Sequence, residues 1–431
     1  MRVNELILYR GMEHEEVLQD MTFLIENAES EYYNKEDLRS LLFEIVHKLV
    51  ELAVSHGFEG NLWHNFITLL LANSENAYST SCEIVGPVEG SINEVALHDF
   101  EIFKELYDYD LKKLEENLAV SVTGMIENYH QAGAHGKVYN KRIRDRICEL
   151  SKKLDQAEDA VSFKAIITEF YREFGVGKFG LHKAFRIENN GDETEIVPIT
   201  KIAHVHLDDL VGYEIAKKKL IDNTEAFVKG KKANNCLLFG DAGTGKSSSI
   251  KAILNQYNDQ GLRMIEVYKH QFQNLNDVIA QVKNRNYNFI IYMDDLSFEE
   301  FEIEYKYLKA VIEGGLEKKP DNILIYATSN RRHLIRETFK DKMDRDEDMH
   351  TNDTVQEKLS LVARFGVTIY FGKPEKKEFQ QIVRVLAQRN GITMPEDQLL
   401  LEANKWELSH GGLTGRTAQQ FIDYLLGKEQ H

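Results

Sequence analysis

The chain has 431 residues, enough for two or three domains, and its 42% hydrophobic and 29% charged residues are ordinary for a globular protein. A formal net charge of −17 gives no overall footprint for nucleic acid or an anionic membrane, although it is compatible with a local basic patch. Three widely spaced cysteines (Cys82, Cys148 and Cys236) predict neither a disulfide framework nor a zinc site, and they favour a reducing cytoplasm. The charged start is unlike a signal peptide, and the longest apolar run, 62–72, is too short to cross a bilayer, so we expect no membrane insertion.

The first part of the chain, residues 1–178, has the pattern of a mainly α-helical N-terminal domain. Apolar residues recur at helical spacing, which predicts stripes that pack against one another. The clearest stripe is Leu42, Ile45, Val46, Leu49, Val50 and Ala53. Residues 179–204 follow as a β-hairpin and linker, because two strand-like runs flank the turn sequence 189–192, Asn-Asn-Gly-Asp.

From residue 205 onward, short apolar runs alternate with amphipathic segments such as 305–316. This alternation predicts an α/β core over 205–373, in which helices cover both faces of a parallel sheet. The segment 374–431 is helical again, and the mixed charge run at 340–353 is expected to be a solvated loop. The expected strands are 235–239, 263–268, 289–293, 323–328 and 367–371.

Residues 240–247 read GDAGTGKS and match the phosphate-loop pattern G-x-x-x-x-G-K-[ST]. An apolar strand precedes them and an amphipathic helix follows, the arrangement that places a helix N-terminus against phosphate. Lys246 is expected to reach the β- and γ-phosphates, and the Ser247 hydroxyl to ligate Mg²⁺. The predicted nucleotide-binding residues of this loop are Gly240, Asp241, Ala242, Gly243, Thr244, Gly245, Lys246, Ser247 and Ser248.

Two later strands end in polar residues. The run 289–293 ends in Asp294 and Asp295, where the first carboxylate is suited to hold Mg²⁺ through water and the second to orient an attacking water. The run 323–328 is followed by Asn330, whose amide is a candidate for positioning that water or sensing the γ-phosphate. The alternative for Asn330 is a turn residue that simply ends its strand.

Together these segments resemble Walker A, Walker B and sensor 1 of the AAA+ ATPases. The resemblance implies a P-loop AAA+ sheet core with a C-terminal helical lid, ATP and Mg²⁺ as ligands, and a homo-oligomer. It also implies that Arg364, in LVARFG, reaches the γ-phosphate of a neighbouring subunit, and that Arg416 belongs to a sensor 2 helix of the lid. The segment 207–213, with Val211 and Gly212 as its predicted nucleotide-binding residues, is similar to the one that lines the adenine pocket.

The chain resembles more closely a group of bacterial AAA+ proteins that form a domain-of-unknown-function family. This resemblance runs from about residue 179 to 426, and it implies no particular substrate. The Asp-Asp pair and the RFG sequence are also similar to the replication-initiator and helicase-loader clade. The stretches that carry the narrower resemblance are NNCLLFGDAGTGKSS, DDLSFE, YATSNRRHL and EKLSLVARFG.

One residue departs from the pattern of many AAA+ motors, which carry glutamate where this chain has Asp295. A catalytic group misplaced by about 1 Å can cost on the order of 10²-fold in rate, so we expect slow hydrolysis. Nearby alternatives for the base are Glu299 and Glu300. Alternatives for the arginine that acts in trans are Arg331, Arg332 and Arg336, each of which is otherwise a solvated surface residue.

Three uses of the nucleotide are compatible with the sequence. The favoured one is an oligomeric ATPase that remodels or scaffolds an unknown protein partner through its N-terminal domain. The others are a nucleic-acid-associated switch, which the acidic balance disfavours, and a regulatory module with little turnover. Phe272 is the candidate for a threading pore loop but lacks the accompanying signal, and the lysine runs 217–219 and 229–232 are expected to be a solvated face.

Overall fold

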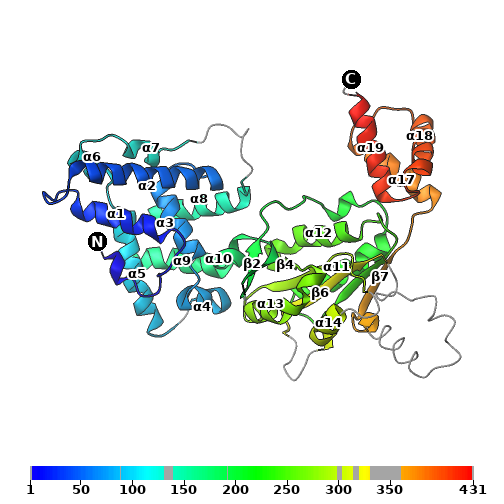
Figure 1. Cartoon of the computed structure of the whole chain (residues 1–431), viewed down its shortest axis with the longest axis horizontal. Helices are drawn as coiled ribbons and strands as arrows, with labels where there is room; N and C mark the ends of the chain where they lie inside the picture. The colour runs from blue at the N-terminus through cyan, green and yellow to red at the C-terminus, as the bar shows by residue number, and fades with distance from the viewer. Residues whose placement is uncertain are drawn as a thin grey trace. The chain divides into compact units, whose positions relative to one another are not determined.

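A computed structural model describes residues 2–87, 89–130, 139–191, 193–298, 303–313, 320–330 and 361–429. The chain forms two compact units, residues 1–182 and residues 183–431 (Figure 1). The first is helical, and the second contains the β-sheet and the C-terminal helices. Each unit has a hydrophobic core of its own.

The first unit confirms the expected mainly helical N-terminal region. Asparagine side chains begin several of its helices, because Asn34, Asn61 and Asn140 each accept a hydrogen bond from a backbone N–H of the first turn. After a short 3₁₀ turn at Val3–Glu5, its helices are α1 (Glu15–Asn27), α2 (Lys35–His56), α3 (Leu62–Asn73), α4 (Ala77–Val85), α5 (Ile92–Tyr107), α6 (Lys112–Leu118), α7 (Thr123–Glu127), α8 (Lys141–Asp155), α9 (Ala160–Phe174) and α10 (Gly177–Leu181).

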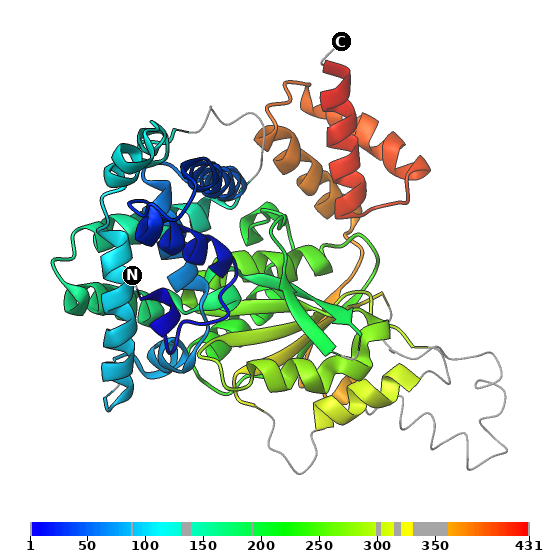
Figure 2. The ribbon, with the colours of Figure 1, turned by 60° about the vertical axis from the view of Figure 1, so that its left-hand side comes forward.

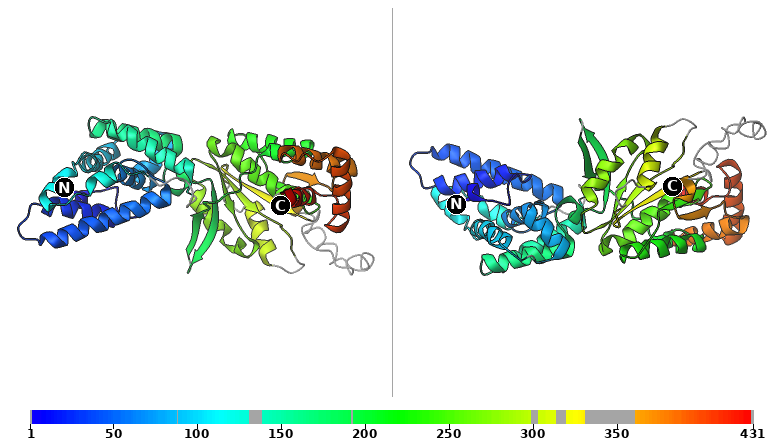
Figure 3. Two further views of the ribbon diagram at one scale, coloured as in Figure 1. Left: turned by 90° about the horizontal axis from the view of Figure 1, so that it is seen from above. Right: turned by 90° about the horizontal axis from the view of Figure 1, so that it is seen from below.

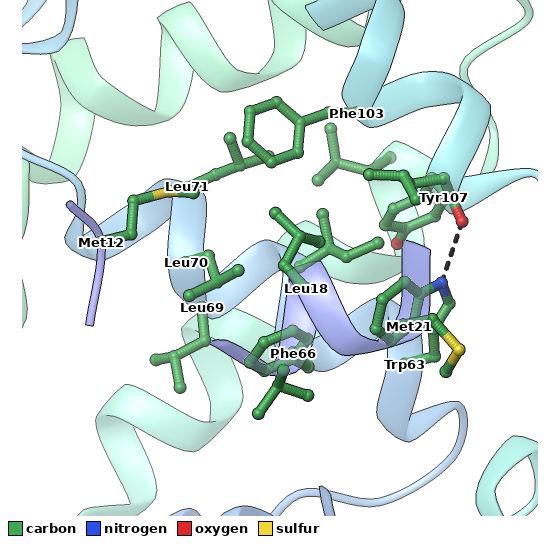
Figure 4. Packing of buried hydrophobic residues seen from close by; sticks show 14 of the residues in the cluster. Met12, Leu18, Met21, Trp63, Phe66, Leu69, Leu70, Leu71, Phe103 and Tyr107 are labelled. Atoms are coloured by element: carbon green, nitrogen blue, oxygen red, sulfur yellow. Dashed lines mark hydrogen bonds between the residues drawn. The ribbon is translucent and has the colours of Figure 1, made fainter. Parts of the chain in front are cut away.

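The α3 helix lies at the centre of this unit and is buried along most of its length. Its side chains Trp63, Phe66 and Leu71 pack against residues of α1 and α5, as Figure 4 shows. The indole Nε1 of Trp63 also donates to the carbonyl of Leu106, 2.9 Å away. A buried tryptophan is thus satisfied both by packing and by a hydrogen bond.

A buried carboxylate fastens the N-terminal segment to the same core. Asp99 of α5 is fully buried and accepts hydrogen bonds from the backbone N–H groups of Ile7, Leu8 and Tyr9, at 2.7 to 3.2 Å. Backbone donors of this kind stabilise a buried charge. The first residues of the chain are therefore held by hydrogen bonds as well as by their apolar side chains.

The second unit is built on a seven-stranded sheet in the order β2-β1-β4-β5-β6-β3-β7. The five expected strands are present with parallel pairing, and the expected hairpin forms the antiparallel pair β1 and β2. The hairpin also joins the sheet, because β1 pairs in parallel with β4, a contact that the sequence did not predict. The strands are β1 (Ala184–Asn190), β2 (Glu193–Pro198), β3 (Cys236–Gly240), β4 (Leu262–Glu266), β5 (Asn288–Met293), β6 (Ile323–Ser329) and β7 (Val367–Phe371).

Helices cover both faces of this sheet, as predicted (Figure 3). On one face, α11 (Glu214–Val228) and α12 (Lys246–Tyr257) pack on alternate strand residues such as Leu238 and Ile290. The other face is covered by α13 (Leu275–Val282) and α14 (Ile303–Glu313). Of the helix expected at 305–316, residues 314–316 lie outside the described chain, as does the charge run at 340–353.

After β7 the chain forms a three-helix lid, shown in orange and red in Figure 2. The lid consists of α17 (Lys376–Arg389), α18 (Glu396–Ser409) and α19 (Gly415–Glu429) and has its own apolar cluster around Phe379, Ala403 and Phe421. Val211, which precedes α11, packs against this cluster. No helix in the described parts of the chain is long and apolar enough to cross a membrane.

Candidate nucleotide-binding site

The strand order brings the predicted catalytic residues to one edge of the sheet. β6 lies between β3 and β5, and all three strands are parallel, so their carboxyl ends meet at the same edge. Lys246 Nζ donates to Asn330 Oδ1 at 3.0 Å, and Asn330 Nδ2 donates to Asp295 Oδ1 at 2.7 Å. Asn330 thus links Lys246, in the phosphate loop after β3, to Asp295, in the turn after β5.

The phosphate loop has the conformation that its glycines predict. Gly240 has a φ of 134°, and a Cβ there would lie 2.1 Å from the backbone oxygen of Phe371, so no other residue fits. Lys246 folds back over the loop, and its Nζ donates to the carbonyls of Gly240 and Asp241 at 3.0 and 2.6 Å. A phosphate group would give this ammonium a negative partner in place of neutral carbonyls.

Burial lowers the pKa of Lys246, although the nearby carboxylates of Asp241, Asp295 and Asp294 act in the opposite direction. The side chain is 6% exposed. An ammonium held in such surroundings gains most from a partner with more negative charge, because desolvation disfavours its charged form. The electrostatics of the loop therefore fit a polyphosphate ligand.

Asp294 and Ser247 meet where the sequence predicted a magnesium site. The Ser247 hydroxyl donates to Asp294 Oδ1 at 2.7 Å, and the Thr328 hydroxyl donates to the same oxygen at 2.5 Å. Partial burial alone would raise the pKa of Asp294, but the hydroxyls around it outweigh burial and lower the pKa. The carboxylate is thus ready to act as an oxygen ligand or water-mediated partner of a hard cation.

Thr328 was not predicted as a site residue. Its hydroxyl also accepts a hydrogen bond from the backbone N–H of Asp295 at 2.9 Å. The only signal in the sequence is that Thr328 stands two residues before Asn330, so that strand alternation places both on one face. A threonine within an apolar strand is too common for that spacing to identify it.

Asp295 occupies a backbone conformation that non-glycine residues seldom adopt, with a φ of 51°. Two hydrogen bonds hold it there, from its own N–H to Thr328 and from Asn330 to its carboxylate. Residues held in such regions gather at functional sites. Asp295 is therefore unusual both in its residue type, where many AAA+ motors have glutamate, and in its backbone conformation.

A cavity of about 710 Å³ lies between the phosphate loop and the lid, a size suited to a bound small molecule. Its lining includes Val211, Arg416 and the loop residues 242–248, which the sequence predicted to bind the nucleotide, whereas Gly212 is not among the lining residues. Gly240 and Asp241 are also not among the lining residues. Their carbonyls accept hydrogen bonds from the Lys246 ammonium. Leu210 and Tyr213, which belong to the segment 207–213 expected near the adenine, also line it. The sequence did not identify the apolar lining by Val205, Phe371, Ile382 and Leu386.

Two hydrogen bonds attach the lid and the residue segment before it to the phosphate loop. The N–H of Arg416 donates to the carbonyl of Gly243 at 3.1 Å, and the N–H of Lys373 donates to the carboxylate of Asp241 at 3.0 Å. The N-terminus of α19, with its positive dipole end, thus adjoins the phosphate loop. Arg416 itself is exposed along this cavity, free to approach a bound anion.

Arg364 is paired within its own chain. It follows residues 361–363 in the turn before β7, and its Nη2 forms a short ion pair with Glu313 at the end of α14. The side chain is 33% exposed, and its Nη1 is buried without a hydrogen-bond partner among the described residues. The remaining candidates, Arg331, Arg332, Arg336, Glu299 and Glu300, lie outside the described residues.

The burial of Lys217 and Phe272 bears on two further expectations. Lys217 is 8% exposed instead of solvated, because it donates to the carbonyl of Leu210 at 2.8 Å and pairs with Glu214 at 2.7 Å. Phe272 is 1% exposed and packs edge-on against Phe298, so it is a core residue and does not present itself to a pore. The other lysines of the two basic runs are exposed.

This protein is a P-loop protein of the AAA+ superfamily. The features that define it are the strand order, the phosphate loop, the two aspartates after β5, the asparagine after β6 and the helical lid. Within this superfamily, residues 180–429 match the family model described as "Protein of unknown function (DUF815)". That match covers more than half of the chain, and the protein belongs to this family.

More distant relatives share shorter stretches. The replication factor C large subunit of Staphylothermus marinus is 35% identical over 81 residues, 19% of this chain and 18% of the relative. That of Methanococcus vannielii is 38% identical over 76 residues, 18% and 15% of the two chains, so this chain spans less than a fifth of either relative. A Thermotoga maritima RuvB mutant has a TM-score of 0.38 at 17% identity, over 52% of this chain and 65% of that one. The RuvB Holliday junction branch migration motor of the same organism has a TM-score of 0.32 at 14% identity, over 51% and 72%.

Proposed function

We propose that this protein binds ATP with Mg²⁺ between the sheet edge and the lid and hydrolyses it slowly to ADP and phosphate. The observation that carries this proposal is the hydrogen-bonded chain from Lys246 through Asn330 to Asp295, which connects the phosphate loop with the acidic strand end. Each member has the chemistry that phosphoryl transfer to water requires, namely charge stabilisation and positioning of the nucleophile.

The protein's own residues divide the work. The loop amides and Lys246 would bind the phosphates, and Arg416 would approach them from the lid. Ser247 and Asp294 would hold magnesium, which neutralises developing charge on the phosphate oxygens. Asp295 would orient the attacking water, and Asn330 would hold Asp295 in place. The hydrogen bonds and the cavity described above support these roles.

We infer slow turnover from Asp295, which is shorter than the glutamate of many AAA+ motors and is held by Asn330. Steady-state phosphate release should stay below about 10 s⁻¹, the median for enzymes. A turnover well above that value would contradict the proposed slow hydrolysis. Binding of ATP with no turnover in any assembly state would instead favour a regulatory nucleotide-binding module, which the same Asn330–Asp295 contact also supports.

We further propose that the site is completed in a homo-oligomer, where Arg364 leaves Glu313 for the γ-phosphate of a neighbouring copy. The helical unit 1–182 would take the protein partner. Cys82, Cys148 and Cys236 form no disulfide, which supports a cytoplasmic location. Light scattering should show a mass that rises with ATP and Mg²⁺; a strict monomer would speak against the oligomer.

Nucleic acid is the alternative partner. The name of two relatives, replication factor C large subunit, favours it, whereas the net charge of −17 opposes it. Binding to DNA whose affinity falls steeply with salt would support this alternative.

Lys246→Ala tests the proposal at its centre. Removal of the ammonium takes away the charge that would meet the phosphates, so calorimetric titration should show much weaker ATP binding than in the unchanged protein. Lys229→Ala is the matched control, because Lys229 is exposed and pairs with Glu225, four residues earlier. Equal ATP affinity in Lys246→Ala and Lys229→Ala would contradict the assignment.

A further inference from the structure

Tyr292 is a buried residue beside the acidic strand end that the site described above does not use. It is the fifth residue of β5, two before Asp294, so strand alternation places both on the same face of the sheet. That face packs under α12, the helix that carries Ser247. Tyr292 is 2% exposed. Its side chain therefore lies beneath the residues proposed to hold magnesium.

The hydroxyl of Tyr292 is buried and has no hydrogen-bond partner in the described parts of the chain. This is unusual in the same molecule, because other deeply buried tyrosines are satisfied. Partners are present for the hydroxyls of Tyr9, Tyr78, Tyr107, Tyr171, Tyr257 and Tyr326. A buried polar group that is unpaired in a resting structure calls for an explanation, and a role with a bound ion is one of the few that exist.

The surroundings of this hydroxyl indicate which partner it would take. A phenol has an ordinary pKa of about 10 and keeps its proton at neutral pH, so the Tyr292 hydroxyl is available as a donor. The hydroxyl lies close enough to the side chains of Asp294 and Ser247 to interact with both, although neither contact has the geometry of a standard hydrogen bond.

Asp294 has room for such a donor. Ser247 and Thr328 both donate to Oδ1, whereas Oδ2 accepts no hydrogen bond from the described residues. We propose that Tyr292 is a positioning residue of the magnesium site, whose hydroxyl donates to the Asp294 carboxylate and fixes its orientation when the metal binds. The inference rests on the proposed nucleotide site and adds to it a residue that the acidic motif does not contain.

The test compares nucleotide binding with and without magnesium. ADP affinity is measured by calorimetry in Mg²⁺ and in EDTA for the unchanged protein, Tyr292→Phe and Tyr326→Phe. Tyr326 is the matched control, because it pairs with Tyr292 across β5 and β6 but its hydroxyl bonds to Asn223 and Thr224, away from the site. Tyr292→Phe should lose about tenfold or more of the gain in affinity that Mg²⁺ gives, the usual effect of outer partners of metal ligands. Its affinity in EDTA should be unchanged, and Tyr326→Phe should keep the full gain.

A second variant separates positioning from packing. With Asp294→Asn already present, Tyr292→Phe should cause no additional loss, because the group through which it acts is gone. An equal magnesium gain in Tyr292→Phe and the unchanged protein would overturn the inference, as would additive losses in the double variant. If the unchanged protein binds ADP but gains nothing from Mg²⁺, the magnesium site itself falls. If it binds no ADP at all, the proposed function is contradicted.

Discussion

Two carboxylates in this chain, one in each unit, are held in opposite ways. Asp99 in the helical unit is fully buried and accepts three backbone N–H groups. Asp294 in the sheet unit faces the cavity and is held by the hydroxyls of Ser247 and Thr328. Backbone donors cannot leave without unfolding their segment, whereas hydroxyls rotate. The first arrangement fixes a structure, and the second allows partners to be exchanged.

The same contrast extends beyond these two residues. At the sheet edge Lys246, Asn330 and Asp295 bond to one another through side chains, and Arg364 is paired with Glu313. Contacts of this type can be replaced by contacts to a ligand or a neighbouring subunit. Variants at the sheet edge should therefore change activity with little effect on stability, and variants around Asp99 should do the reverse.

The largest effect is expected for Arg364→Ala. If Arg364 acts in trans, its loss should lower ATP hydrolysis by on the order of 10³- to 10⁵-fold, the range known for arginine fingers. ATP affinity should be unchanged, because the residue contributes nothing to the loop of its own subunit. Phosphate release and calorimetric titration measure the two quantities. Retention of more than half the activity would refute the role.

Asp99→Asn should have the largest effect on stability. The amide nitrogen cannot accept the backbone N–H groups, so the free energy of unfolding of the helical unit should fall by about 3 kcal/mol. Trp63 reports on this unit in urea titrations once Trp406 of the lid is replaced by Phe. Asp108→Asn is the control, because that carboxylate is exposed and pairs with Lys104. A fall in ATP affinity without a loss of stability would break the comparison.

A smaller effect is expected from pH. Burial lowers the pKa of His64, although Asp155 and the carbonyl of Tyr107 oppose this, so the folded imidazole takes up a proton less readily than the unfolded one. Stability is complete above the unfolded pKa of about 6.5 and is lost as the pH falls below it, by at most about 1.4 kcal/mol per pH unit. His64→Gln should flatten the profile followed through Trp63. An unchanged profile would show that other groups dominate.

The smallest effect on stability is expected for Glu313→Gln. The pair with Arg364 is about one-third exposed, and such pairs contribute roughly 0 to 1 kcal/mol. The variant should nevertheless raise ATP turnover in the assembled protein, because Arg364 no longer has to leave a charged partner. Comparison with Glu402→Gln, which removes an exposed pair on the lid, controls for charge. Lower turnover would show that Glu313 supports the arginine instead of retaining it.

Much of the sheet and the site followed from local sequence signals. An apolar run ending in polar residues predicts both a strand and its functional end, and this placed Lys246, Ser247, Asp294, Asp295 and Asn330 in one region. Residues that meet only through packing gave no such signal. The cavity lining from the lid and the pairing of β1 with β4 depend on contacts between distant segments.

What the sequence analysis got wrong or missed also depends on contacts between distant atoms. Lys217 was expected on a solvated face because its two neighbours are lysines, yet helix geometry turns it inward against Leu210 while they remain exposed. Tyr292 reads as one more apolar strand residue, and only its unpaired hydroxyl distinguishes it. Sequence patterns report which face a residue occupies more reliably than which atoms it meets.

The hairpin of β1 and β2 has a consequence for solubility. Without it, the edge of the sheet would be β4, whose residues are nearly all buried and which would offer apolar side chains and free backbone groups to another chain. The actual edge, β2, carries exposed Glu193 and Glu195 and ends in Pro198, features that discourage the addition of a further strand. This side of the sheet is thereby protected against aggregation through the addition of strands.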